Sequence, residues 1–243
     1  MAFRKPAFGL LYLLATNSYA LSYPPYTALL SIGPAWANAG KSQTITLQPE
    51  LFKTYSANKA TGTLANGELF LGVQQAINEK IQAAMGFVVA GNGTAKLSGD
   101  IWEDADPAFN NYKYTYNLNQ FRMGAKVRLI GRGYHLISHF FPYLSGSAGI
   151  GFNHAYHYEV TSSLFQEIAA PDFGSQTTTS FSYTLSAGLQ KIVNTHWQVG
   201  IGYEFADWGA NQLKKAPGQT SGSGLAMAHS YTNGLQLLLS YQA

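Results

Sequence analysis

The sequence predicts an all-β protein: an antiparallel, up-and-down transmembrane β-barrel of eight strands, preceded by a cleavable signal peptide. Three observations carry this prediction: an export signal at the N-terminus, an apolar–polar alternation with a period of two, and a composition poor in charge. Only 11% of the 243 residues are charged, against roughly 25% in a typical soluble domain, while 14% are aromatic. Such a chain has too few charges to cover a conventional soluble surface.

The composition also excludes several classes of protein. The chain contains no cysteine, which rules out disulfide scaffolds, thiolate metal sites and cysteine nucleophiles. The formal net charge of +3 is small and scattered, so we expect no nucleic-acid partner. The mean hydropathy of −0.07 argues against a bundle of membrane-spanning helices.

The first twenty residues have the three parts of an export signal. Arg4 and Lys5 are basic, residues 7–15 are apolar, and Ser18 and Ala20 are small residues before a cut after Ala20. The apolar run is about half of the ~20 residues that a spanning helix needs. We therefore predict a signal peptide at residues 1–20 and a single barrel domain at residues 21–243.

Eight segments then alternate in polarity. The last is the clearest, with Leu235, Leu237 and Leu239 on one face and Gly234 and Gln236 on the other. In chain order, the apolar faces of the other seven cover residues 30–36, 69–73, 81–89, 121–129, 144–156, 181–189 and 197–205.

Two positions in these segments need special geometry. Pro34 has no N–H for a strand ladder, so it should lie at a bulge or near the rim. Tyr112, Tyr114 and Tyr116 have the opposite parity to Phe121, which predicts a bulge near Asn119.

The connections between the segments alternate in length. Short turns fall near residues 78–79, 131–133 and 194–195, and long links cover residues 38–66, 91–111, 161–177 and 210–228. Long loops at one end and short turns at the other are typical of transmembrane barrels, whose short turns face the periplasm.

The chemistry of the polar face indicates which side is outside. A soluble barrel would show water a face rich in Lys and Glu, whereas this face is mostly small and neutral, as expected of a narrow lumen. Its few charges have both signs and could pair inside the barrel: Glu68, Arg122, Lys126, Arg128 and Glu204. Aromatic residues near the strand ends predict two interfacial girdles: Trp197 and Tyr241 at the short-turn end, and Trp36, Tyr156, Phe205 and Tyr231 nearer the long loops.

The signal peptide, the eight alternating strands and the C-terminal run from Leu235 to Ala243 together resemble a known family. It is that of the small Gram-negative outer-membrane barrels, which includes the opacity-type surface antigens and the transmembrane domain of outer membrane protein A. The resemblance implies an outer-membrane location in contact with membrane lipid and lipopolysaccharide. It also implies that the barrel assembly machinery recognises the last strand, which often ends in an aromatic residue; here Tyr241 lies two positions before Ala243.

The histidines do not form a predicted metal site. None of the histidines has Asp, Glu or Cys at the spacing of metal ligands. His154 and His157 are three residues apart on one strand, so they should point to opposite faces. The six histidines are His135, His139, His154, His157, His196 and His229. We predict no metal and no cofactor.

One group of residues raises the question of catalysis. Asp207, His229, Ser230 and Glu204 lie on the last two strands, which are neighbours, but alternation places His229 on the lipid side and Ser230 in the lumen. A nucleophile needs its base within hydrogen-bond reach. We therefore expect no catalytic residues and no enzyme activity.

Three classes of function remain. The favoured one is a structural, surface-exposed barrel whose long extracellular loops contact envelope or host-surface partners, with the loop partner unspecified. One alternative is a narrow porin or small-ligand conduit, although eight strands leave an interior just wide enough for side chains. The second alternative is an outer-membrane lipid-modifying enzyme.

Overall fold

The computed structural model describes residues 25–38, 40–49, 51–58, 62–103, 106–132, 140–162, 172–220 and 222–243. The predicted signal peptide, His135 and His139 lie outside the described residues. Within them, no helix is both long enough and apolar enough to span a membrane. The elements are β1 (Tyr26–Ala37), β2 (Gln43–Gln48), β3 (Leu51–Ala57), β4 (Thr63–Asn78), β5 (Ile81–Glu103), the 3-10 helix η1 (Pro107–Phe109), β6 (Asn110–Gly131), β7 (Phe140–Ser162), β8 (Gln176–Ile192), β9 (Trp197–Asp207), β10 (Asn211–Gln212), β11 (Ala226–Met227) and β12 (Tyr231–Gln242).

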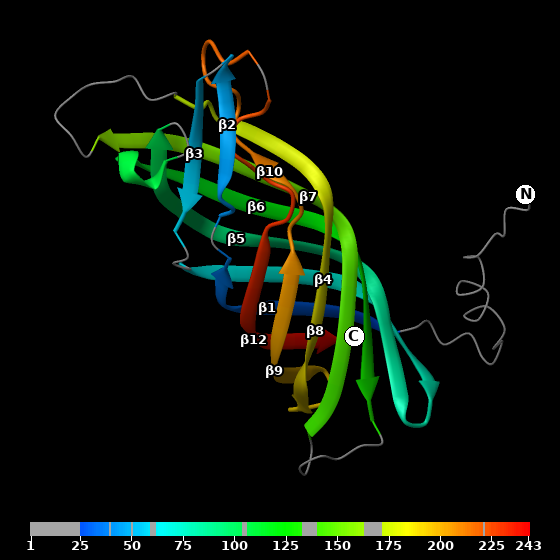
Figure 1. The fold of residues 1–243 in the computed structure, drawn as a ribbon. Helices are drawn as coiled ribbons and strands as arrows, with labels where there is room; N and C mark the ends of the chain where they lie inside the picture. Colours follow the sequence, from blue (N-terminus) through cyan, green and yellow to red (C-terminus); the bar gives the residue numbers. More distant parts are fainter. Residues whose placement is uncertain are drawn as a thin grey trace, which may run out of the picture.

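Eight strands close into a ring, as predicted. Each pairs antiparallel with the next in the order β1, β4, β5, β6, β7, β8, β9, β12, and β12 pairs back with β1. The β2–β3 hairpin adds to this ring where β3 pairs with the end of β5. In Figure 1, β5, β6 and β7 run the length of the molecule, and the β2–β3 hairpin stands at the end opposite the β4–β5 turn.

Asparagine side chains close two of the short turns. The Asn78 Oδ1 accepts hydrogen bonds of 2.9 Å from the backbone N–H groups of Lys80 and Ile81, which joins β4 to β5. The Asn194 Oδ1 accepts from His196 and Trp197 at 2.9 and 2.8 Å, which joins β8 to β9. Asparagine suits both places because its side chain bonds the backbone two residues on.

Over half of its length the barrel has an apolar exterior and a polar interior. On β12, Leu235 and Leu237 are 53% and 61% exposed, while the alternate residues Gln236 and Ser240 are buried inside. Apolar side chains of the neighbouring strands point outward in the same way, among them Ile201 on β9 and Phe87 on β5. A continuous exposed apolar band on a closed barrel is the surface that faces lipid, so the parity predicted from the sequence is confirmed.

The polarity inverts further along the same strands. On β6 the outward residues change from Phe121 and Val127 to Asn119 and Lys113, while Tyr112 and Tyr114 point inward and are buried. We call the region beyond this change the outer half: residues 94–103, 110–119 and 155–162 of β5, β6 and β7, with β2, β3 and residues 208–228. Its interior is apolar, formed by Ile45, Leu47, Tyr55, Leu97, Ile101, Tyr112, Tyr114, Tyr116, Leu118, Tyr158, Phe173, Leu213, Leu225 and Met227. The outer half is therefore built like a water-soluble domain.

This inversion corrects two predictions. The prediction of a bulge near Asn119 is wrong, because buried and outward residues of β6 alternate without a break from Tyr112 to Ile130. The extra residues lie in its neighbours instead, between Asn92 and Ala95 of β5 and beside His157 of β7, which has a φ of 55°. The long loop predicted at residues 91–111 is also wrong, since most of it belongs to β5 and β6.

The described residues 208–220 and 222–228, which lie between β9 and β12, fold into the outer half. Asn153 of β7 holds the start of this inserted segment by donating hydrogen bonds of 2.8 Å to the carbonyl groups of Trp208 and Ala210. The other end is tied to β2, where the Gln43 side chain bonds the backbone C=O and N–H of Ala226. The described part of the loop predicted at 210–228 is thus held at both ends and covers the open end of the barrel.

Two wall positions show how closely the strands approach. A Cβ on Gly149 of β7 would lie 2.5 Å from the Cα of Gly124 on β6, so only glycine fits there. A Cβ on Gly202 would lie 1.8 Å from the hydroxyl of Tyr143, whose ring covers this glycine from inside the lumen. Pro34 lies near the outer end of β1, where the pairing with β12 lapses at Gly33 and Pro34 without a register shift.

Candidate functional site

Four of the five predicted lumen charges meet in one cluster. The Arg122 Nη2 lies 2.6 Å from the Glu68 Oε2, and the Lys126 Nζ donates to the Glu68 Oε1. Glu204, on the far wall, is 3.9 Å from Arg122 and accepts a 3.3 Å hydrogen bond from Asn66. We call Glu68, Arg122, Lys126 and Glu204 the lumen cluster. Because β4, β6 and β9 are not neighbours, these contacts cross the lumen.

Arg128, the fifth charge, is placed differently. Its Nη2 donates a 2.6 Å hydrogen bond to the Gln190 Oε1, and its guanidinium lies 4.1 Å from the centre of the Tyr143 ring. Gln190 in turn donates to Gln198 at 3.0 Å, and Gln198 to Gln242 at 3.4 Å. A row of amide groups therefore leads from the buried cation towards the short-turn end of the barrel.

Side chains fill the lumen on both sides of the lumen cluster. Towards the short turns, an apolar group packs beneath it: Leu29, Phe70, Ala84, Val88, Ile130, Tyr143 and Leu238. Towards the outer half lies Trp208, which is fully buried with Ala90 and Ala206. The Trp208 Nε1 donates to Thr232 at 2.9 Å, and its ring lies 5.5 Å from the Arg122 guanidinium. The lumen is therefore packed above, at and below its charges.

Trp208 was not found by sequence reasoning. It follows the end of β9, outside the alternating pattern, and is followed by Gly209 in the left-handed region at φ 82°. The chain turns inward at this glycine, so no periodic signal marks the tryptophan as an interior residue.

The six aromatic residues predicted as girdles lie on the outside of the barrel. At the short-turn end, Trp197 meets Tyr241 edge to face at 5.0 Å. At the opposite edge of the apolar band, Phe205 stacks on Tyr231 at 5.6 Å. Trp36 and Tyr156 also point outward near this edge.

A carboxylate–histidine pair lies at the outer edge of the apolar band. The Asp207 carboxylate is buried, accepts from the backbone N–H of Gly209 at 2.8 Å, and lies 2.8 Å from the His229 Nδ1. Because an ionised carboxylate only accepts, we assign the donor to Nδ1, and the other nitrogen of a neutral imidazole is then an acceptor. The His229 ring is 58% exposed and stacks on Tyr231.

The other candidate catalytic residues stay apart from this pair. Ser230 faces the lumen, where its Oγ accepts a 3.0 Å hydrogen bond from Gln120, and Glu204 belongs to the lumen cluster. The structure thus brings Asp207 to His229 and keeps Ser230 and Glu204 in the lumen.

The prediction that His154 and His157 point to opposite faces is wrong. The bulge in β7 turns both outward, where His154 lies 2.9 Å from Thr177 and His157 lies 3.0 Å from Glu159. Across the described residues, no group of three or more His, Cys, Asp or Glu could hold a metal ion.

The tyrosines of the outer half are held in their neutral form. Burial raises the pKa of Tyr114 to about 12, and Asp100 adds to the shift. Burial likewise raises the pKa values of Tyr55 and Tyr158, whose rings both pack on Phe173. A phenolate in this core would be desolvated, so the packing depends on the neutral side chains.

Comparison with known proteins shows the fold alone. No protein-family model and no curated protein matches the sequence. The outer membrane protease OmpT of Escherichia coli aligns over 94% of this chain and 100% of its own, with a TM-score of 0.51 and 8% identity. The outer membrane protein OprG of Pseudomonas aeruginosa aligns over 90% and 97%, with a TM-score of 0.49 and 12% identity. Neisserial surface protein A aligns over 89% and 96%, with a TM-score of 0.46 and 10% identity.

The apolar band, the closed antiparallel ring and the two aromatic girdles are the features of a barrel that spans a bilayer. Short turns at one end and a larger extramembrane part at the other are typical of outer-membrane barrels, whose short turns face the periplasm. The chain therefore has the fold of the small β-barrels of Gram-negative outer membranes.

Proposed function

We propose that this protein acts at the cell surface, through its outer half, as a structural barrel that contacts envelope or host-surface partners. The observation that supports this proposal is the contrast between the two halves. The lumen of the spanning half is filled with side chains, whereas the outer half has a polar exterior on an ordered core. We further propose that the protein is not an enzyme.

A filled lumen argues against the conduit as a second function. The lumen cluster, Arg128 and Trp208 are each 4% exposed or less. An eight-stranded barrel leaves room for little more than its own side chains. We therefore expect planar bilayers that contain the protein to show no steady solute-sized conductance. Steady conductance by the intact protein would favour the conduit.

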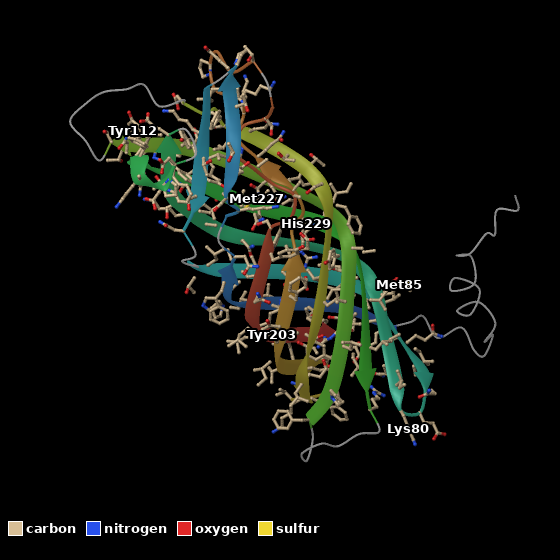
Figure 2. All side chains as sticks on the ribbon, in the orientation of Figure 1. Lys80, Met85, Tyr112, Tyr203, Met227 and His229 are labelled. Carbon is tan, nitrogen blue, oxygen red and sulfur yellow. The ribbon has the colours of Figure 1, made fainter. Side chains whose placement is uncertain are left out.

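Single cysteines can test which surface meets the outside, because the chain has none of its own. We expect Lys96→Cys, on the outward face of the outer half, to react with a membrane-impermeant maleimide on intact cells. Lys80→Cys, in the β4–β5 turn, should react only after the outer membrane is opened. Figure 2 shows Lys80 at the end far from Tyr112 of the outer half. The reverse labelling pattern would refute the proposal.

The surface role itself can be tested by exchange of the β2–β3 hairpin. Replacing residues 43–57 by a short polar linker should abolish adhesion of expressing cells to host-cell monolayers. The variant barrel that lacks the hairpin should still be present in the outer membrane. Unchanged adhesion would show that the partner surface lies elsewhere.

We propose that β12 also carries the signal for barrel assembly. Tyr241 lies on its outward face, packed on Trp197 and stacked on His196. Tyr241→Ala should slow the appearance of the folded, heat-modifiable form in cells more than Tyr203→Ala, an outward tyrosine on β9. Equal rates would contradict a special role for Tyr241.

A further inference from the structure

The five charged side chains inside the barrel leave one positive charge over. All five are 4% exposed or less: the carboxylates are Glu68 and Glu204, and the cations are Arg122, Lys126 and Arg128. Glu68 bonds both Arg122 and Lys126, and Glu204 lies beside Arg122. Within the described part of the chain, Arg128 forms no ion pair, and Glu68 acts on it only through space. Burying an unmatched charge is costly, so a counter-ion at Arg128 would stabilise the folded barrel.

Two buried hydrogen-bond donors lie beside this cation without a partner. The Arg128 guanidinium donates through Nη2 to Gln190, but its Nε is buried and has no acceptor among the described residues. The Tyr143 ring centre lies 4.1 Å from the guanidinium carbon, and the Tyr143 hydroxyl is likewise buried without a hydrogen-bond partner there. Buried donors in proteins nearly always have an acceptor. An unmatched cation with two unused donors has the chemistry that binds an anion.

The row of amide groups connects Arg128 to the short-turn end with its dipoles aligned. Gln190 turns its oxygen to Arg128 and donates through its nitrogen to Gln198, which donates in the same sense to Gln242. Each amide therefore has its negative end towards the cation and its positive end towards the short turns. Gln242 is only partly buried, and its backbone N–H bonds to His196 of the β8–β9 turn. An anion that approaches this end meets N–H groups and the field of the cation behind them.

The surroundings of Arg128 leave room for a small ligand at most. The Tyr143 ring belongs to the apolar group below the lumen cluster, and Ala84 of that group is the cross-strand partner of Arg128. Towards the outer half, the lumen cluster and Trp208 close the lumen. A ligand that enters from the short-turn end would therefore bind at Arg128 and would not pass through. In such apolar surroundings, opposite charges attract each other more strongly than in water.

We propose that Arg128 and Tyr143 form a binding site for one small monovalent anion, such as chloride. The Arg128 Nε and the Tyr143 hydroxyl donate hydrogen bonds to the anion. A single negative charge balances the single cation left over, whereas a divalent anion would leave a negative charge buried. The carboxylates and cations of the lumen cluster already balance one another, so the site is separate from that cluster. The proposal does not rest on the surface role of the outer half.

Chloride titration of the intact, detergent-extracted barrel tests this site. Sodium chloride replaces sodium gluconate, whose anion is too large for the lumen, at constant ionic strength, and the readout is the urea midpoint of the heat-modifiable gel shift. An anion that binds only the folded barrel raises this midpoint as its concentration rises. Tyr143→Phe removes the hydroxyl but keeps the ring on the guanidinium, and Arg128→Gln removes the charge. Lys80→Gln is the matched control, because it removes an exposed cation from a turn at the same end.

We expect the wild type and Lys80→Gln to show the same rise in urea midpoint and Arg128→Gln to show none. Tyr143→Phe should need about tenfold more chloride for the same rise, because the anion loses one of its two donors. Equal rises in the wild type and Arg128→Gln would overturn the site and show an adventitious ion only. A wild type that does not respond to chloride would also overturn it. An unchanged response of Tyr143→Phe would overturn the role of the hydroxyl.

Crystals of the wild-type barrel grown in bromide give a readout that does not depend on how the variants fold. Bromide scatters X-rays anomalously, which distinguishes it from water. We expect one anomalous peak within hydrogen-bond distance of the Arg128 Nε and the Tyr143 hydroxyl. Density at this place without an anomalous signal would mean that water fills the site, and would overturn the proposal. Failure of the adhesion experiment would leave both readouts unchanged.

Discussion

Replacing Glu68 by glutamine should destabilise the barrel more than any other single change in the lumen. Glu68 is buried and is the direct partner of two cations, Arg122 at 2.6 Å and Lys126. Glutamine keeps one acceptor oxygen but removes the negative charge. Glu204 is then the remaining carboxylate of the lumen cluster, and of the two cations Arg122 is the one that lies within 4 Å of it, at 3.9 Å. Breaking a buried ion pair from one side costs about 3–5 kcal/mol.

The assay is urea unfolding in lipid vesicles, with the heat-modifiable gel shift as the folded-state readout. A double-mutant cycle of Glu68→Gln with Lys126→Met should show a coupling above roughly 1 kcal/mol, since the two side chains are in contact. The matched control is the cycle with Arg128→Gln, which removes a cation bonded to Gln190 instead. That second pair should show a clearly smaller coupling, because Glu68 acts on Arg128 through space and Arg128 is hydrogen-bonded to Gln190.

Two results would refute this reasoning. The first is a Glu68→Gln barrel that loses less than about 1 kcal/mol of unfolding free energy, because the ion pairs would then contribute little. The second is equal coupling of Glu68 to Lys126 and to Arg128. That result would mean that the lumen charges stabilise one another through long-range electrostatics and not through the contacts described above.

Three further predictions concern the wall and the outer half. Val127→Arg, outward on β6 in the apolar band, should cost about 2–4 kcal/mol in urea unfolding, while Asn119→Arg on the same face of the same strand should cost about 0–1 kcal/mol; equal costs would contradict the polarity inversion. The pKa of Tyr114 is raised in the folded state, so its contribution to stability is present below its unfolded pKa of about 10 and is lost as the pH rises towards about 12. Tyr114→Phe should therefore resist alkaline unfolding better than the wild type, and phenolate absorbance during a pH titration checks this. Gly149→Ala should destabilise the barrel by about 1–3 kcal/mol through overpacking, whereas Gly67→Ala, with open space around its Cβ, should be neutral or slightly stabilising; similar thermal unfolding of the two variants would count against the close strand approach.

The alternation in the sequence predicted the ring of eight strands and the lipid-facing side of each. Leu237 and Gln236 illustrate why: adjacent residues on a strand point to opposite faces, and a two-faced wall needs opposite polarity on those faces. The burial of all five lumen charges follows from the same parity. The partner of each charge did not follow, because Glu68 and Lys126 lie on strands separated by β5 and their heights depend on register.

The predictions that failed share one physical cause. Alternation distinguishes two faces but does not say which is inside once the surrounding solvent changes from lipid to water. The opposite parity of Tyr112, Tyr114 and Tyr116 therefore predicted a bulge near Asn119, although β6 continues unbroken and places these tyrosines in the interior of the outer half. The outward turn of His157 and the inward turn of Trp208 both depend on residues with positive φ beyond the regular pattern.

The change of polarity along β6 has a consequence for how the protein sits in its bilayer. Sliding the barrel outward would lift Phe121 into water, and sinking it would draw Asn119 into hydrocarbon, so both displacements are opposed. The boundary between hydrocarbon and water on this strand therefore falls between these two residues and fixes the depth of the barrel in the bilayer. At about 3.3 Å per residue and a tilt of about 40°, residues 110–119 raise their far end by ~25 Å. A partner that binds the outer half therefore binds it at a fixed height above the lipid surface. A bilayer of different thickness will deform around the barrel and will not shift it.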